Sequence, residues 1–228
     1  MSAQLRLSLQ RSPSYARAAF TVSQSNSAAT RVLDAWPDWR GGALVLVGPP
    51  GSGKTHLAAI WARRVGAQMI SPNGPEPEGL DRPILVDDAD QHLQGEALFH
   101  LINLAAQHGS SLLMTARAPP SQWPADLPDL RSRLNALPVA ELLEPDDAVL
   151  TAMLAKFFRE RSIRPSDELL AYLLRRIERS AVHAQEIVVK LDEAADAAQR
   201  PLTRALARQV LEDMSEDDDE NADHAQPV

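Results

Sequence analysis

The sequence predicts an α/β fold in which a parallel sheet of five strands is flanked by helices and followed by a small all-helical domain. One observation is the phosphate-loop pattern G-x-x-x-x-G-K-[ST], which residues 48–55 match at every fixed position. A second is that apolar runs alternate with segments of helical spacing up to Glu144, as they do in βα units. A third is that only helical segments follow Glu144. We therefore place a domain boundary near this residue.

Composition narrows the class of protein. The 228 residues suffice for one medium α/β domain with a small satellite, and 44% of them are hydrophobic. The absence of cysteine excludes disulfides and thiolate metal sites. The sequence has no secretory signal pattern and no apolar run long enough to span a membrane, so a cytoplasmic protein is expected.

Charge is unevenly distributed along the chain. The net charge is −8, yet residues 215–228 carry six acids and no lysine or arginine, so the remainder is close to −2. A nearly neutral folded part does not indicate a basic DNA-binding surface. We expect the acidic end to be a disordered, solvated tail, with a nucleic-acid mimic as the alternative.

The elements follow in a regular order. Residues 1–13 are expected to form a flexible arm, residues 14–144 the nucleotide-binding domain and residues 145–214 a helical lid. Strands are predicted at 43–47, 67–70, 83–87, 111–115 and 139–142, where short apolar runs suit a buried parallel sheet. Helices are predicted over 27–36 with Asn26 as N-cap, from the phosphate loop to Gly66, and over 95–107. The lid helices are expected at about 146–161, 166–178, 181–198 and 203–214, with Pro165 and Pro201 marking two starts.

The phosphate loop predicts a bound nucleotide. It consists of Gly48, Pro49, Pro50, Gly51, Ser52, Gly53, Lys54 and Thr55. Backbone N–H groups of such a loop and the following helix N-terminus attract phosphate oxygens. Lys54 would reach the β- and γ-phosphates, and the Thr55 hydroxyl would be a ligand of Mg²⁺.

Polar residues at the ends of two further strands fit the same site. Asp87 and Asp88 end an apolar strand, as in a Walker B element, where the first acid would hold Mg²⁺ and the second could polarise an attacking water. Thr115 ends the next strand, where a hydroxyl can face the γ-phosphate, although an ordinary strand-end threonine is the alternative. Arg131 and Arg133 precede the last strand and could include a residue that reaches a neighbouring subunit's γ-phosphate. A surface arginine pair is equally compatible with the pattern.

Together these motifs resemble the AAA+ ATPases of the DnaA branch. The similar stretches are 53–57, 86–90, 116–120 and 130–134, the last with Leu134 where phenylalanine is usual, and the resemblance covers about residues 14–214. It implies that Arg133 is the arginine finger. It also implies that Phe20, Val22, Asn26 and His56 contact the nucleotide. The sensor 2 position of the third lid helix aligns with His183, although Arg176 or Arg179 could substitute for it.

Two departures refine the resemblance. No DNA-binding helix-turn-helix domain is found after the lid, so direct specific DNA binding is not expected. Near the N-terminus, Gln4, Leu5, Leu7 and Leu9 form a pattern similar to the sliding-clamp-binding peptide of the Hda family of DnaA regulatory inactivators. An edge strand with alternating leucines is the alternative.

The resemblance then implies a negative regulator of replication initiation that carries ADP or ATP with Mg²⁺. It would be tethered to the DNA polymerase III sliding clamp (the beta subunit) and would stimulate hydrolysis of DnaA-bound ATP. A helicase-loader-type ATPase and a passive DnaA-binding adaptor are the alternatives. Intrinsic ATPase activity and the choice between monomer and homodimer are left open.

Overall fold

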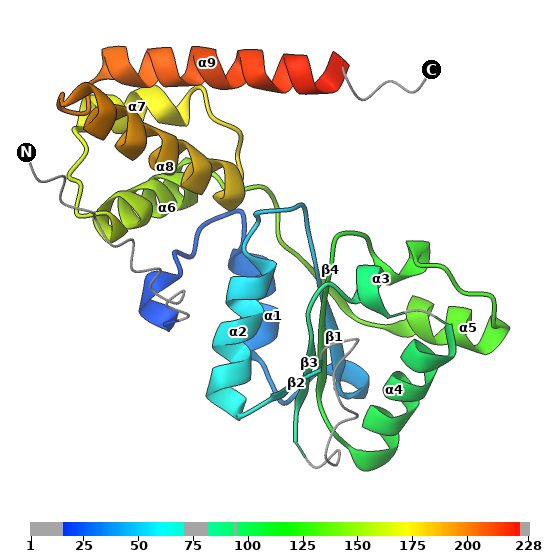
Figure 1. Ribbon diagram of the computed structural model, residues 1–228. Helices are drawn as coiled ribbons and strands as arrows, with labels where there is room; N and C mark the ends of the chain where they lie inside the picture. The colour runs from blue at the N-terminus through cyan, green and yellow to red at the C-terminus, as the bar shows by residue number, and fades with distance from the viewer. Residues whose placement is uncertain (1–15, 71–81, 94, 224–228) are drawn as a thin grey trace, which may run out of the picture.

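The computed structural model describes residues 16–70, 82–93 and 95–223, with side chains placed as far as Met214. Figure 1 shows two lobes, an α/β lobe built on the sheet and a helical lobe at the upper left. The predicted boundary at Glu144 lies between the last strand, which ends at Glu141, and the first lid helix, which begins at Asp147. Within the described residues, none of the helices combines the length and apolar character needed to cross a membrane.

The sheet has five parallel strands in the order β2-β3-β4-β1-β5, which confirms the predicted architecture. Their bounds are β1 Ala43–Val47, β2 Gln68–Ile70, β3 Ile84–Val86, β4 Leu112–Ala116 and β5 Val139–Glu141. In the register, Val47 pairs with Ala116 and Val86 with Met114. The carboxyl ends of the three central strands therefore meet at one edge, where open α/β sheets bind their ligands.

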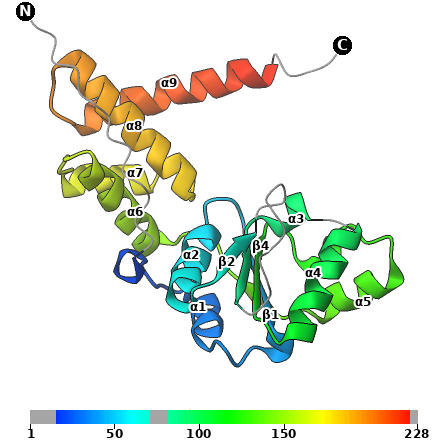
Figure 2. The same cartoon turned by 60° about the horizontal axis from the view of Figure 1, so that its bottom comes forward.

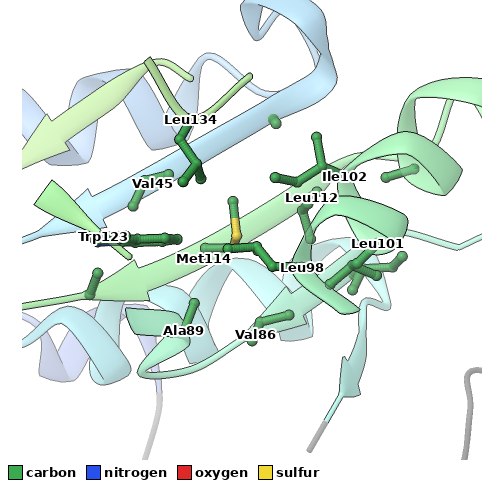
Figure 3. Packing of buried hydrophobic residues seen from close by; sticks show 14 of the residues in the cluster. Val45, Val86, Ala89, Leu98, Leu101, Ile102, Leu112, Met114, Trp123 and Leu134 are labelled. Carbon is green, nitrogen blue, oxygen red and sulfur yellow. The ribbon is translucent and has the colours of Figure 1, made fainter. Parts of the chain in front are cut away.

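Helices cover both faces of the sheet. Helices α1 (Ser27–Asp34) and α2 (Lys54–Val65) lie on one face, and α3 (Ala89–His92), α4 (Gly95–His108) and α5 (Pro128–Ala136) lie on the other (Figures 1 and 2). Because side chains alternate along a strand, β1 serves both cores. Leu44 and Leu46 pack with α1 and α2, whereas Val45 and Val47 pack with α4 and α5. Figure 3 shows this second core, with Val45, Met114 and Leu134 facing one another.

Helices α3 and α5 and three short 3-10 helices were not predicted from the sequence. Helix α3 has four residues, too few to show a helical period. Helix α5 begins with proline in a proline-rich stretch and buries only Leu130 and Leu134, one turn apart. The 3-10 helices are η1 Arg17–Ala19, η2 Arg40–Gly42 and η3 Pro120–Gln122.

The second lobe contains four helices that share one core. They are α6 Asp147–Glu160, α7 Asp167–Leu174, α8 Ala181–Ala198 and α9 Arg204–Asp223. Three of them begin with a side-chain cap, because Asp146, Ser166 and Ser180 each accept a hydrogen bond from the backbone N–H three residues ahead. Their apolar faces form a core separate from the sheet, built on Leu154, Phe158, Leu173, Ile187, Leu191 and Val210 among others.

Helix α9 differs from the prediction at its end. The sequence predicted a helix up to Met214 and disorder beyond it, whereas the helix continues through the acidic residues to Asp223. No glycine or proline interrupts this stretch. Extending a helix already anchored on the lid core needs no new nucleus, so charge repulsion alone does not end it. Helix α7 is shorter than predicted, since it ends at Leu174 rather than near residue 178.

Candidate nucleotide-binding site

The phosphate loop joins the carboxyl end of β1 to the N-terminus of α2, as its pattern predicts. Lys54 is the first residue of α2 and is 6% exposed. Its ammonium group donates hydrogen bonds to the carbonyl oxygens of Gly48 at 2.8 Å and Pro49 at 3.0 Å. Burial lowers the pKa of Lys54, an effect that the carboxylate of Asp88 opposes most. A buried cation with acids nearby thus lies at the helix N-terminus.

The loop fits a phosphate group. The Ser52 hydroxyl is buried and has no hydrogen-bond partner within the described residues, although buried polar atoms are normally paired. The first N–H groups of α2 face the same loop and lack partners inside the helix. Lys54, Ser52 and these N–H groups are the donors that would hold the phosphates.

The candidate metal ligands lie side by side. The Thr55 hydroxyl donates to both carboxylate oxygens of Asp87, at 3.0 and 3.2 Å. A hydroxyl and a carboxylate at the edge of a phosphate loop are the oxygen ligands that Mg²⁺ takes in nucleotide sites. The structure therefore brings together the two residues that the sequence assigned to the metal.

Thr115 is oriented differently from the expectation. The sequence suggested that its hydroxyl faces the γ-phosphate, yet the residue is fully buried. The hydroxyl donates to Asp87 at 2.6 Å and accepts the backbone N–H of Asp88 at 2.8 Å. Asp88 follows in a left-handed conformation (φ 47°, ψ 49°), which this hydrogen bond helps to hold. In this geometry Thr115 is a positioning residue for the acidic pair.

A pocket of about 100 Å³ beside the loop has the character of a base-binding site. It is lined by Phe20, Asn26, Ser52, Gly53, His56 and Ala181 and by the apolar side of α6 at Val149, Met153 and Phe157. The rings of Phe20 and His56 meet edge to face with centroids 5.5 Å apart. Burial lowers the pKa of His56 to about 4, with a smaller effect from Lys156, so the imidazole is neutral at neutral pH. Neutral aromatic walls suit the planar base of a nucleotide.

Asn26 lies at the predicted N-cap but acts differently. Its side chain makes no hydrogen bond to α1. It accepts from the Ser23 N–H at 3.0 Å and donates to the Thr21 carbonyl at 2.9 Å. These bonds shape the segment that carries Phe20 into the pocket. Val22, which the resemblance assigned to the nucleotide, is 46% exposed and does not line the pocket.

The lid residues expected to sense phosphate face elsewhere. His183 lies 3.9 Å from the Glu178 carboxylate and lines a groove on the lid, not the phosphate loop. The guanidinium of Arg176 stacks on Tyr172 at 4.2 Å. Arg179 donates to Asp147 at 2.6 Å and to the Pro145 carbonyl at 3.2 Å. None of the three alternatives considered for sensor 2 therefore lines the pocket in this structure.

Sequence reasoning missed the contact that the lid makes instead. The backbone N–H of Ala181, at the start of α8, donates to the Gly51 carbonyl at 3.2 Å. A side chain at Gly51 would place its Cβ 2.6 Å from the Ser180 Cβ, at a φ of +73°. Ser180 was recognisable as a helix start, but nothing in the sequence pairs it with the phosphate loop. No sequence motif indicated the role of Asp90 either. Its carboxylate accepts hydrogen bonds from the backbone N–H groups of Arg117 and Ala118, and so holds the segment that follows β4.

The two arginines of α5 differ in their surroundings. Arg131 donates to the carbonyls of Ser121 at 2.9 Å and Trp123 at 2.8 Å, and so holds the η3 loop. Arg133 is exposed in the last turn of α5, with its guanidinium 5.6 Å from the centre of the Phe99 ring. Helix α5, which carries Arg133, covers the face of the sheet opposite α2. Gln4, Leu5, Leu7 and Leu9 lie outside the described residues.

Sequence comparison relates the chain to known proteins. A family profile described as "ATPase family associated with various cellular activities (AAA)" matches residues 44–106. The chromosomal replication initiator protein DnaA of Clavibacter sepedonicus is 25% identical over 241 residues, which cover 92% of this chain and 50% of that protein. An uncharacterized protein of Haemophilus influenzae is 29% identical over 182 residues, covering 72% of this chain and 79% of that protein. The chain thus spans about half the length of the initiator proteins it matches.

Solved structures show the same fold. Domain III of the Thermotoga maritima replication initiation protein DnaA superposes with a TM-score of 0.72 at 19% identity, covering 89% of this chain and 97% of that one. The Thermotoga maritima RuvB Holliday junction branch migration motor gives a TM-score of 0.59 at 18% identity, with 75% and 61% covered. At such identities the likeness establishes the fold and leaves the activity to be argued from the site.

Proposed function

We propose that this chain is an AAA+ protein of the DnaA branch and, within it, an Hda-type regulatory inactivator of replication initiation in its HdaA form. The nucleotide held between the phosphate loop and α6 would be ADP or ATP, with Mg²⁺ on Thr55 and Asp87. Its main role would be to fix the lid relative to the sheet. The reaction that it promotes would occur in the ATP site of a DnaA molecule, in the cytoplasm.

The observation that carries this proposal is the placement of Arg133. It is exposed, lies on the face of the sheet opposite α2, and contacts the Phe99 ring. A guanidinium so placed is available to the γ-phosphate of a neighbouring DnaA. There it would stabilise the charge that develops as water attacks the γ-phosphorus and the bond to the ADP oxygen breaks. Such a residue is worth roughly 10³–10⁵ in rate.

The N-terminal leucine pattern supplies the targeting part of the proposal. Docking of Gln4, Leu5, Leu7 and Leu9 on the DNA-loaded beta subunit would raise the local concentration of this chain near newly copied DNA. The net charge of −8 is consistent with targeting through a protein rather than through DNA.

The direct test measures conversion of DnaA-bound ATP to ADP in single turnover, with this chain and clamp-loaded DNA present or absent. We expect acceleration by the natural chain, and loss of it in Arg133→Ala and in a variant lacking residues 1–13. Arg133→Lys keeps the charge but not the planar fork, so it should recover little. Arg159→Ala, an exposed arginine of the lid, is the matched control.

The alternatives give different results in the same assay. If Arg133→Ala binds DnaA and accelerates hydrolysis as the natural chain does, the protein is a passive adaptor. If the chain captures a replicative helicase and single-stranded DNA rather than the clamp, it is a helicase loader. Acceleration that does not need residues 1–13 would remove the tethering step.

A further inference from the structure

A groove on the lid, separate from the pocket beside the phosphate loop, is lined by several basic side chains although the protein is acidic. It lies between α7, α8 and α9 and is lined by Tyr172, Arg176, His183, Arg204, Arg208 and Glu212, with Leu211 and Met214 as its apolar part. Its volume is about 890 Å³. Tyr172 carries two guanidinium groups, from Arg176 at 4.2 Å and from Arg204 at 5.2 Å, measured to the ring centre. The ring thus fixes both cations beside the groove.

The cations are only partly neutralised. Arg204 lies 3.5 Å from Glu168 and Arg208 lies 2.7 Å from Glu212, both as exposed pairs. No ion pair to Arg176 is found within the described part of the chain, and Glu178 faces His183 at 3.9 Å. Exposed pairs of this kind are weak and exchange partners readily. The groove can therefore accept further carboxylates.

The same helix that borders the groove continues into the most acidic stretch of the chain. Met214 is the last residue of α9 whose side chain the structure describes, and it belongs to the lid core; the helix continues to Asp223. Figures 1 and 2 both show this second half running past the ends of α7 and α8. It contains Glu216, Asp217, Asp218, Asp219, Glu220 and Asp223 and no basic residue. Acids near a helix C-terminus oppose the helix dipole, so a cationic neighbour would stabilise this half of α9.

Helix α9 therefore carries its two basic residues, Arg204 and Arg208, in its first two turns and six of its eight acids in its last two. Its 20 residues span about 30 Å. When two copies of such a helix align antiparallel over their whole length, Arg204 comes level with the other copy's Asp223, and Arg208 with the other copy's Asp219. With twofold symmetry, the basic end of each α9 lies beside the acidic end of the other, so the contact is self-complementary. The antiparallel dipoles also attract each other.

We propose that the lid groove is a homodimer interface, which receives the acidic second half of α9 from a second copy of this chain. The occupant follows from charge complementarity and from the length of α9 beyond the lid core. A nucleic-acid backbone fits less well, because it has no cationic groups to meet the acidic second half of α9, whereas a second copy brings its own Arg204 and Arg208 to that half. This inference does not depend on the proposed inactivator function.

The test is sedimentation velocity of the full chain over a micromolar concentration series. We expect a monomer–dimer equilibrium that weakens at least tenfold when NaCl rises from about 0.05 M to about 0.5 M. The double variant Arg176→Glu/Arg208→Glu should be monomeric, as should Asp217→Lys/Asp219→Lys. A mixture of the two should form a heterodimer, since each repulsive change meets its complement. Arg159→Glu, on α6 outside the groove, should dimerise as the natural chain does.

Circular dichroism of each variant checks that the lid helices persist, and the heterodimer arm itself excludes a folding defect. A chain that stays monomeric at low salt, or a dimer that the groove substitutions leave intact, would overturn the proposal. Capture of a fluorescent single-stranded oligonucleotide by the groove without dimerisation would also overturn it and point to nucleic acid.

Discussion

Replacing Thr115 by valine separates a positioning hydroxyl from an ordinary strand-end threonine. Valine keeps the shape of the buried side chain but removes the hydroxyl that bonds Asp87 at 2.6 Å and Asp88 N–H at 2.8 Å. A hydrogen bond to a charged group contributes about 1.5–3 kcal/mol, and an unpaired amide in a partly buried site costs about 1–3 kcal/mol. We expect Thr115→Val to lower the free energy of unfolding by about 3 kcal/mol in total.

Urea unfolding followed by tryptophan fluorescence isolates this effect. All four tryptophans, namely Trp36, Trp39, Trp61 and Trp123, belong to the α/β lobe, so the signal reports that lobe without the lid. Trp61 is 1% exposed and stacks on Trp39 at 5.2 Å, which makes the change on unfolding large. Thr115→Ser keeps the hydroxyl and loses one buried methyl group, so it should cost only about 1 kcal/mol.

Binding supplies the second readout. Because Thr115 holds Asp87, we expect Thr115→Val to weaken Mg²⁺-dependent ADP binding, measured by calorimetry, while Thr115→Ser binds nearly as the natural chain does. If Thr115→Val unfolds within about 0.5 kcal/mol of the natural chain, the two hydrogen bonds do not support the acidic pair, and the positioning role is wrong.

Three further predictions follow from single contacts. Gly51→Ala should weaken ADP binding, measured by calorimetry, at least tenfold, because the new Cβ would lie 2.6 Å from the Ser180 Cβ. Gly66→Ala is the control: Gly66 has a similar φ of +68°, but, apart from its chain neighbours, no atom of the described residues lies within 4 Å of the position that a Cβ would take. This variant should lose about 1 kcal/mol of stability and bind ADP normally. Asp146 caps α6. Burial raises the pKa of Asp146, but hydrogen bonds from Ser23, Val149 and Ser25 outweigh this effect and lower the pKa overall. The ionised carboxylate therefore stabilises the fold above its ordinary pKa of 3.8, and this contribution is lost as pH falls through the lower pKa of the folded state. Asp146→Asn should flatten that acid limb in thermal unfolding followed by circular dichroism; an unchanged profile would contradict the assignment. Burial depresses the pKa of His56 from 6.5 to about 4, so the unfolded chain binds the proton more tightly and the α/β lobe should lose stability as pH falls from 6.5 towards 4. His56→Gln should remove this dependence in the fluorescence assay, and persistence of the same slope would assign it to another group.

The sequence was sufficient for the elements that carry a strong local signal. The phosphate loop, β1 and the lid helix α8 lie where their patterns predict them, because a motif, an apolar run and a helical segment each depend on neighbouring residues. Asp87 and Thr55 meet as predicted because parallel strands end at one edge of the sheet. Helices α3 and α5 carry no such signal, since one is too short and the other starts among prolines.

Three features of the structure depend on tertiary contacts and could not be predicted from local sequence patterns. Thr115 was assigned to the γ-phosphate from its place at a strand end, but which way its hydroxyl turns depends on the backbone of Asp88, whose left-handed conformation no pattern reveals. The lid contact through Ala181 required knowing how two lobes of separate cores meet. Helix α9 ends later than its charge density predicts, because a helix already anchored on the lid core continues through like charges.

The joint between the lobes explains how a nucleotide could organise this chain without a charged lid sensor. The lobes meet through two described backbone contacts near the site, Ala181 N–H to the Gly51 carbonyl and Ser25 N–H to the Asp146 carboxylate at 3.4 Å. Both contacts flank the pocket lined by Phe20 and Phe157. A ligand that fills this pocket touches both lobes, so its binding free energy is partly spent on fixing the lid. Nucleotide affinity and lid position are then one equilibrium, and a substitution that separates Gly51 from Ser180 must weaken both together.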